Sequence, residues 1–402
     1  GFFAEAKSHC KKLIQKAEYK EEFEILKSAY KEYWDLHLLS GELDYESNDE
    51  IQAELRLIGE KEQELVKLEG KYRLVTTLYY NYFFGKRDSK CRDQIKQATK
   101  QLDGFKSNSD KAKHVLFEIK SIEYMVHSNL DCHHETRKNQ FKNLINSPVF
   151  EDQPLLKLMV LSNMFTKLKS QVLVNELKAY LIFMEAYFKP VLEEDSDRVF
   201  IEKYYDIYFS NQSFIQIWLP SEAQLNKLLE QFNLVTSKGY LSNPILIGRI
   251  YLSLIELQII SGNNDETIPL LAVFFSTSKK NKYSKHYISG DLLFLLQQYL
   301  NGRSDTFDAA IESLNRKIRR NEIKLDQDEK TLLELLNALC KSVVKDTQNY
   351  INRISNKQTY KLFVYMLTST SSVTEIRAKY FPINDPEYTP DRDEFLTSLA
   401  KH

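Results

Sequence analysis

The densest group of side chains that could do chemistry lies near residue 130, where His127, Cys132, His133 and His134 stand close together. Imidazole nitrogens and a thiolate are ligands that zinc and iron take, provided that several of them converge in space. His133 and His134 are adjacent, so on a helix their side chains point about 100° apart. No second cluster in the sequence completes a ligand shell. We therefore predict a polar helix start with an incidental cysteine, no metal and no other cofactor, and these four residues are the candidates for a metal site.

Two runs of basic residues, 279–286 and 316–324, could bind an anionic partner, and tyrosines interleave with the first. A simpler interpretation is a lysine-rich linker followed by a helix C-terminus whose dipole favours cations. The chain carries 55 basic and 56 acidic residues, whereas nucleic-acid-binding proteins usually show a basic excess, so nucleic acid is the less favoured partner. The residues of these runs that could contact a partner are Tyr283, Lys285, Tyr287, Arg316, Arg319 and Arg320.

The sequence patterns of several large enzyme classes are absent. There is no phosphate loop, dinucleotide fingerprint, HExxH or Gly-x-Ser-x-Gly. We therefore predict that the protein is not an enzyme. The alternative stays open, because a catalytic group assembled from distant helices leaves no local pattern.

The composition favours helix throughout. The 402 residues include 11 glycines and 9 prolines, and no proline precedes Pro148. Strands joined by turns need more of these residues, while the abundant Leu, Lys, Glu, Ala and Gln favour helix. The sequence thus predicts an all-α fold.

The four cysteines are far apart, with no Cys-x-x-Cys pair, which fits a reducing compartment and not a disulfide framework. We therefore predict a cytoplasmic protein. The sequence begins with Gly1 and not with Met, so a removed leader before Gly1 stays an open alternative. The most apolar stretch, 245–260, is interrupted by Arg249 and Glu256. This interruption indicates a buried core helix and not a membrane span.

A turn written Gly-x-x-Asp recurs along the chain. Gly can adopt the left-handed conformation that ends one helix, and an Asp three residues later can cap the N–H groups that begin the next. The motif therefore predicts tight corners between helices. Its copies begin and end at Gly41 and Asp44, Gly85 and Asp88, Gly262 and Asp265, and Gly302 and Asp305, with a relaxed copy at Ser128 and Asp131.

These corners are regularly spaced. Gly41 and Gly85 are 44 residues apart, Gly85 and Ser128 are 43 apart, and Gly262 and Gly302 are 40 apart. A period of about 40 residues made of two helices is typical of a helical solenoid.

Two segments have a distinctive helical pattern. Apolar residues from Ile51 to Tyr82 keep a spacing of three and four, which predicts one helix of about 30 residues, either inside a bundle or as a coiled-coil seam. Pro220 interrupts the array further on, and Ser221 and Gln224 after it form the pattern of a capping box.

The segment 249–275, RIYLSLIELQIISGNNDETIPLLAVFF, has an apolar helix, a glycine turn and a second helix. It resembles the tetratricopeptide (TPR) repeat, and the segment 292–314 has a similar layout with Ala309 and Ala310 on its second helix. The helix-A Trp and the closing Pro of that family are mostly absent, and the period exceeds its 34 residues. HEAT-like helix pairs have the right period and remain a rival label.

The resemblance implies a right-handed α-α superhelix. We expect about eight to nine helix pairs in one continuous array over 1–380, followed by a proline-rich extended tail at 381–402. Such arrays bind protein or peptide partners on a concave face, so the predicted function is a non-enzymatic binding scaffold with no membrane association. The alternatives are a ligand- or peptide-responsive regulatory sensor and, less favoured, nucleic-acid binding through the two basic runs. The sequence leaves the oligomeric state open.

Overall fold

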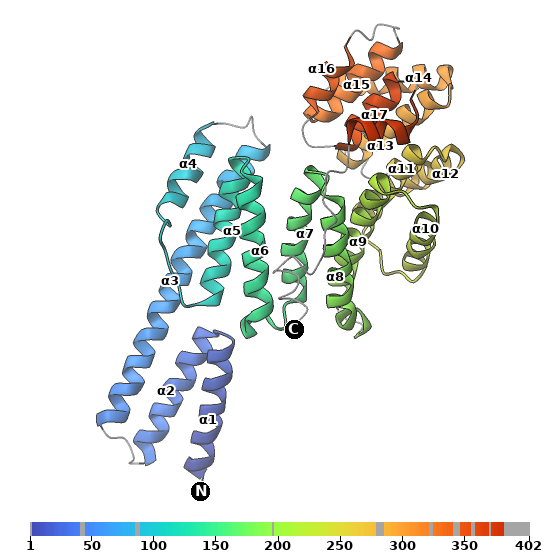
Figure 1. The fold of residues 1–402 in the computed structure, drawn as a ribbon. Helices are drawn as coiled ribbons and strands as arrows, with labels where there is room; N and C mark the ends of the chain where they lie inside the picture. The colour runs from blue at the N-terminus through green and yellow to red at the C-terminus, as the bar shows by residue number, and fades with distance from the viewer. Residues whose placement is uncertain are drawn as a thin grey trace. The chain divides into compact units, whose positions relative to one another are not determined.

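The computed structural model describes residues 2–40, 45–84, 89–194, 197–278, 285–320, 325–340, 346–354, 358–369 and 371–381. Within these ranges every regular element is a helix (Figure 1), which confirms the predicted all-α fold. The chain divides into two compact units, unit 1 at residues 1–167 and unit 2 at residues 168–402. The single continuous array over 1–380 that the sequence predicts stays a prediction. The expected tail lies outside the described residues apart from Phe381.

Unit 1 is built from helices that pack on their neighbours in sequence from α1 to α6, with a further contact between α3 and α5. Its elements are α1 (Phe2–Tyr19), α2 (Phe23–Ser40), α3 (Tyr45–Phe84), α4 (Ser89–Lys100), α5 (Asp110–Val126), α6 (Leu130–Asn146), the 3-10 helix η1 (Pro148–Phe150) and α7 (Pro154–Ser170), which crosses the boundary between the units.

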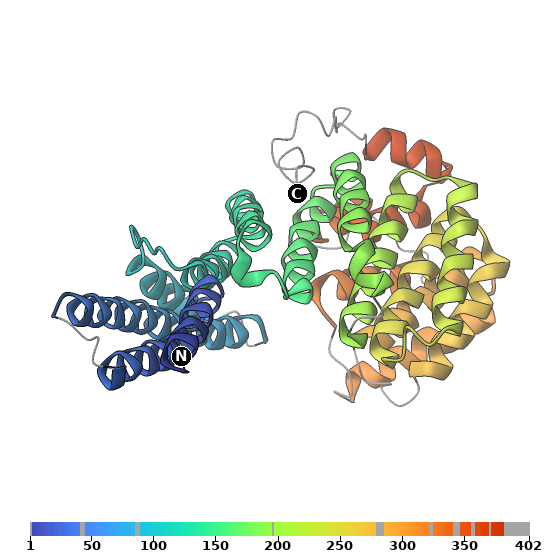
Figure 2. The ribbon, with the colours of Figure 1, turned by 90° about the horizontal axis from the view of Figure 1, so that it is seen from below.

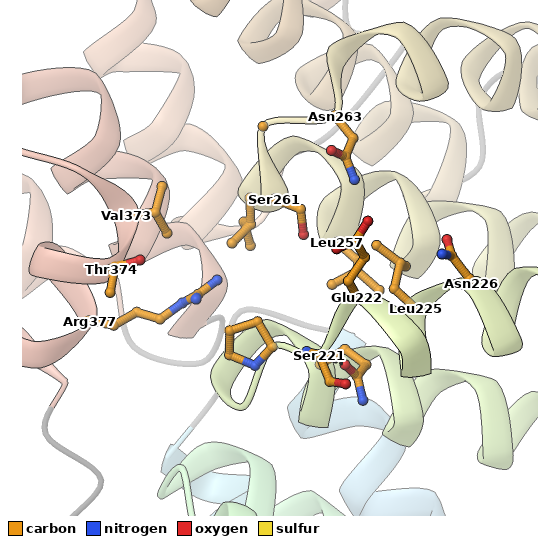
Figure 3. Close-up of a pocket in the computed structure, with 14 residues that line it drawn as sticks. Ser221, Glu222, Leu225, Asn226, Leu257, Ser261, Asn263, Val373, Thr374 and Arg377 are labelled. Atoms are coloured by element: carbon orange, nitrogen blue, oxygen red, sulfur yellow. Dashed lines mark hydrogen bonds between the residues drawn. The ribbon is translucent and has the colours of Figure 1, made fainter.

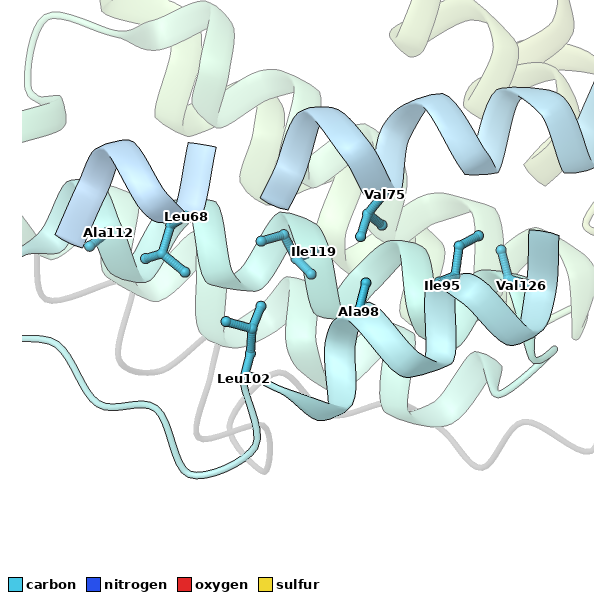
Figure 4. Packing of buried hydrophobic residues seen from close by; sticks show 8 residues of the cluster. All are labelled: Leu68, Val75, Ile95, Ala98, Leu102, Ala112, Ile119 and Val126. Carbon is cyan, nitrogen blue, oxygen red and sulfur yellow. The ribbon is translucent and has the colours of Figure 1, made fainter. Parts of the chain in front are cut away.

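Helix α3 is the longest element, with 40 residues where the sequence predicts about 30. Ile58 in its first half packs against apolar residues of α1 and α2. Val75 in its second half is fully buried and belongs to a cluster with Ile95 of α4 and Ile119 of α5 (Figure 4). The apolar stripe of α3 therefore packs against α1 and α2 in its first half and against α4 and α5 in its second half. This is the packing of a helical bundle and not of a two-stranded coiled coil.

Glu21, in the turn between α1 and α2, is hydrogen-bonded to the start of α5. Its carboxylate accepts hydrogen bonds from the backbone N–H groups of Asp110 and Lys111, both at 2.9 Å, and from the hydroxyl of Ser109 at 2.9 Å. Ser109 is itself the N-cap of α5, because its hydroxyl accepts from the N–H of Ala112 at 3.1 Å. A carboxylate at a helix N-terminus also complements the helix dipole, so residues far apart in sequence are held together.

Unit 2 contains the remaining described helices. They are α8 (Val174–Glu193), α9 (Arg198–Trp218), α10 (Glu222–Ser237), α11 (Pro244–Ser261), α12 (Asn264–Ser278), α13 (Lys285–Leu300), α14 (Ser304–Arg319), α15 (Gln327–Cys340), α16 (Thr347–Arg353), α17 (Gln358–Thr368) and α18 (Val373–Tyr380).

Alternate helices of unit 2 contact one another: α9 packs on α11, α11 on α13, α13 on α15, and α15 on α17. Burial follows the same alternation. Helices α9 and α11 bury residues on most of their circumference, whereas α10 and α14 bury one stripe each, which is typical of a helix with one face to solvent. Figure 2 shows the helices of unit 2 from a second side. The stripe of α10 is Leu225, Leu228, Phe232 and Val235.

The glycine corners that the structure describes adopt the left-handed conformation. Gly262 ends α11 with a φ of 75°, and Gly302 precedes α14 with a φ of 66°. Ser128, in the relaxed copy, has a φ of 56°. The copies that begin at Gly41 and Gly85, with their partners Asp44 and Asp88, lie outside the described residues.

The aspartates of the motif stand two positions too late to be N-caps. Asp131, Asp265 and Asp305 are each the second residue of a helix, α6, α12 and α14 respectively. At α6 the N-cap is Asn129, whose side chain accepts from the N–H of Cys132 at 3.3 Å, so the predicted capping role of Asp131 is wrong. An acidic residue in the first turn still favours the helix, because it lies near the positive end of the dipole.

Helix α11 corresponds to the most apolar stretch of the sequence. Among the described residues it is the one helix whose length and mean hydropathy of 1.4 would suit a membrane span. More than half of it is buried inside unit 2, where it packs on α9, α12 and α13. A core helix meets the same two criteria as a membrane span.

Candidate functional site

Two neighbouring cavities in unit 2 flank the start of α10. Cavity A has a volume of about 660 Å³ and lies between α10, the end of α11, and α18 (Figure 3). Cavity B has a volume of about 440 Å³ and lies between α8 and α10, with α9 as its floor. Both are lined by Gln216 and Ser221, so the two cavities meet at the connection between α9 and α10.

The start of α10 is not capped in the way the sequence predicts. Ser221 is the N-cap residue, but its side chain makes no capping hydrogen bond. The backbone N–H of Ser221 donates instead to Oε1 of Gln216 on α9, at 3.0 Å. The predicted capping box with Gln224 is therefore wrong, because Gln216 satisfies the N–H group that Gln224 would have bound. Gln224 is exposed and lines cavity B.

Side-chain amides and one phenol dominate the polar lining of cavity B. Gln212, Gln216, Gln224 and Gln231 all contribute to its wall. The hydroxyl of Tyr208 donates to Oε1 of Gln231 at 2.9 Å. Each amide offers both N–H donors and a carbonyl acceptor, the same pair of groups that a peptide bond offers. The amides of cavity B can therefore hydrogen-bond a chain of peptide groups, with Lys178, Glu185 and Lys227 as the charged residues of its lining.

Burial and one nearby carboxylate keep the phenol of Tyr208 in cavity B neutral. Burial and the nearby Glu185 carboxylate raise the pKa of Tyr208 to about 12. Burial also raises the pKa of Glu185, against the opposing effects of a hydrogen bond from Gln212 and the charge of Lys227. Tyr208 thus remains a hydroxyl donor and acceptor at neutral pH.

Cavity A contains an arginine, Arg377, that forms no ion pair among the described residues. The side chain of Arg377 extends from α18 into the cavity, toward the side formed by α10 and α11 (Figure 3). Its Nε atom is buried without a hydrogen-bond partner, and its guanidinium forms no ion pair with the residues that the structure describes. Burial lowers the pKa of Arg377, but guanidinium groups stay protonated in proteins.

A second polar cluster in unit 2 lies outside both cavities. Asp206 of α9 is buried and forms ion pairs with Lys203 at 3.2 Å and with Arg249 of α11 at 3.3 Å. Lys169 lies nearby, and burial followed by the charge of Arg249 lowers its pKa to about 8. The ion pair between Asp206 and Arg249 links α9 to α11. The cluster borders neither cavity A nor cavity B.

The four candidate metal ligands of the sequence are divided between the end of α5 and the start of α6. His127 is the C-cap of α5, while Cys132, His133 and His134 lie in the first turns of α6. His133 is buried, and burial followed by the charge of Arg137 lowers its pKa to about 4. Across the described ranges, no three His, Cys, Asp or Glu side chains are grouped so that they could hold a metal ion.

The basic residues proposed as partner contacts fall into several environments. The Nζ atom of Lys317 on α14 lies 5.7 Å from the ring centre of Tyr287 on α13, and it pairs with Asp291 at 3.0 Å. These groups line a small cavity of about 210 Å³. Arg316 and Arg319 are exposed in the last turn of α14, where cations complement the dipole, and Arg320 is its C-cap. Tyr283 and the side chain of Lys285 lie outside the described residues.

Sequence reasoning missed the residues of both cavities. Glutamines carry no motif, and Arg377 is far from α10 in the sequence, so only the fold brings them together. One signal was present: the irregularity at Pro220 marks the connection where the cavities meet.

No protein-family model matches this chain, and no curated protein and no solved structure matches it either. The function is therefore inferred from the geometry and charge of the two cavities.

Proposed function

We propose that this chain is a non-enzymatic protein- or peptide-binding scaffold that holds an extended peptide segment in cavities A and B of unit 2. The observation that carries the proposal is the row of side-chain amides in cavity B, joined to cavity A through Gln216. An extended peptide exposes one N–H and one C=O per residue, and amide side chains can pair with both. Ile182 of α8, 59% exposed on the wall of cavity B, offers an apolar contact for a peptide side chain.

The contact pattern of unit 2 supports a helical-repeat architecture for the scaffold. Odd-numbered helices from α9 to α17 contact one another, as one layer of a two-layer array of helix pairs would. We propose that unit 2 is such an array, TPR-like or HEAT-like, with a right-handed superhelix. The proposed groove lies between the even-numbered helices α8 and α10.

A peptide selection on the full-length chain tests this function. Random peptides would be selected on the wild-type protein, and their affinities measured by fluorescence anisotropy. The double variant Gln212→Leu and Gln224→Leu removes two amides with little change in volume. If each amide forms one hydrogen bond to the peptide, binding weakens by roughly tenfold per substitution.

The matched control is Gln348→Leu, because Gln348 is an exposed glutamine on α16 that borders neither cavity. This variant should bind with wild-type affinity. Selected peptides that bind the double variant as tightly as the wild type would contradict the proposal, and so would the failure of every peptide to bind.

A second candidate function is a ligand- or peptide-responsive regulatory sensor. One observation favours it: cavity A is lined by α10 and α11 and also by α18, which is far away in the sequence. A ligand that contacted both sides would favour one spacing between these helices over others. A ligand-dependent change in the radius of gyration, measured by small-angle scattering, would separate a sensor from a passive scaffold.

A further inference from the structure

Among the residues that the structure describes, Arg377 has no ion-pair partner, and it lies in a partly enclosed site. Its Nε atom is buried without a partner, although a buried polar group normally has one. The nearest acidic residue on its own helix, Glu375, is engaged in a capping box with Ser372. Glu222 lines the same cavity from α10, yet it forms no ion pair with Arg377. The residues around Arg377 therefore leave its donors unused.

A guanidinium with unused donors fits a planar anion. Its N–H groups form a fixed fork that matches the two oxygens of a carboxylate, and such bidentate pairs are among the stronger hydrogen-bonded contacts. A carboxylate carries one negative charge and suits a cavity that Glu222 also lines, because repulsion from Glu222 grows with the charge of the ligand.

Cavity A also adjoins the amide-lined cavity B, since Gln216 and Ser221 border both. A chain that occupies cavity B is therefore close enough to extend into cavity A. The anionic groups of a peptide are its C-terminal carboxylate and the side chains of Asp and Glu.

We propose that cavity A is a carboxylate-binding subsite, in which Arg377 pairs with a carboxylate of the peptide that lies in cavity B. This inference rests on the proposed peptide-binding function and adds a requirement to it: the bound peptide carries a carboxylate at one end of the segment.

The test uses the selected peptides in three forms: with a free C-terminal acid, with a C-terminal amide, and with Asp and Glu replaced by Asn and Gln. Their affinities are measured for the full-length wild type, Arg377→Gln and Arg377→Lys. Removal of the correct carboxylate should weaken wild-type binding by about ten- to a hundredfold. It should have little further effect on Arg377→Gln, because the two partners form one interaction.

Arg377→Lys keeps the charge but loses the fork, so it should give an intermediate affinity. The matched control is Lys379→Gln, which removes one positive charge from an exposed position of the same helix and should leave binding unchanged. A loss in the amide form identifies a C-terminal carboxylate, and a loss in the Asn and Gln form identifies a side chain.

The carboxylate subsite is wrong if peptides bind the wild type but Arg377→Gln and the uncharged peptide forms cause no loss. That result would leave the peptide-binding function standing. The failure of every peptide to bind would overturn both, because the subsite depends on the peptide.

Discussion

Oε1 of Gln216 lies 3.0 Å from the backbone nitrogen of Ser221 and accepts its hydrogen bond. This contact joins the end of α9 to the start of α10. It replaces the hydrogen bond from the N–H of Ser221 to Gln224 that a capping box within α10 would contain. It also places Gln216 at the border of both cavities. The local turn and the proposed binding groove therefore depend on the same side chain.

The first prediction compares two serines at helix starts. Ser221→Ala should change the free energy of unfolding by only a few tenths of a kcal/mol, because its hydroxyl caps nothing. Ser109→Ala should cost about 1–2 kcal/mol, since its hydroxyl caps α5 and contacts Glu21. Urea unfolding of the two variants measures both values. Equal losses would show that the hydroxyl of Ser221 caps α10 after all, in addition to the hydrogen bond that its N–H donates to Gln216.

The second prediction concerns the close packing of α12 on α13. A Cβ atom at Gly290 would lie 2.2 Å from a ring atom of Phe274, which is fully buried. Gly290→Ala should therefore lower the free energy of unfolding by about 1–3 kcal/mol. Gly59→Ala is the control, because nothing lies within 4 Å of a Cβ at that position of α3. The control should raise stability by about 0.5–1 kcal/mol, since alanine favours helix over glycine.

Thermal or urea unfolding distinguishes the outcomes of these two glycine variants. If Gly290→Ala were as stable as Gly59→Ala, α12 and α13 could not approach each other as closely as the structure shows.

The third prediction concerns the pH dependence of unit 1. The pKa of His133 falls from 6.5 to about 4 on folding, chiefly because of burial, and burial also lowers the pKa of His114. Between pH 6.5 and about 4 the unfolded chain binds protons that the folded chain does not, so stability falls as pH falls through this window. The shift of His133 alone corresponds to about 3 kcal/mol.

Glu118 adds a loss of the same sign at lower pH. Its folded pKa is lowered by the charge and the hydrogen bond of Arg137, which outweigh its burial, so its stabilising contribution disappears as the carboxylate is protonated. His133→Leu should flatten the dependence of unfolding free energy on pH between 7 and about 4.5. The control is His9→Leu, at an exposed position of α1. Identical pH profiles for the two variants would contradict the burial of His133.

Several features of the fold could be predicted from the sequence because they depend on local spacing. The stripe Leu225, Leu228, Phe232 and Val235 recurs every three or four residues and is buried on α10. Gly262 follows an apolar helix and takes the left-handed conformation that few other residues tolerate. The capping positions could not be predicted as reliably, because Asn129 caps α6 in place of Asp131 and Gln216 accepts from the N–H group that Gln224 would have bound.

The candidate site could not be predicted, because its parts meet only through tertiary packing. Gln212, Gln231 and Arg377 belong to three helices, and none of them is part of a motif. The residues that the sequence singles out, such as His133 and Arg316, have local reasons for their positions: a buried helix start and the end of a helix dipole. Local patterns thus indicate the scaffold more readily than the groove.

The most direct test of peptide binding in the groove is site-specific photo-cross-linking. A photoreactive benzoyl-phenylalanine would replace Ile182, which is 59% exposed on the wall of cavity B, or Leu234, which is 53% exposed on α10 outside both cavities. With a selected peptide, the proposal predicts a covalent adduct from position 182 and none above background from position 234. Equal labelling at both positions, or labelling at position 234 alone, would contradict it.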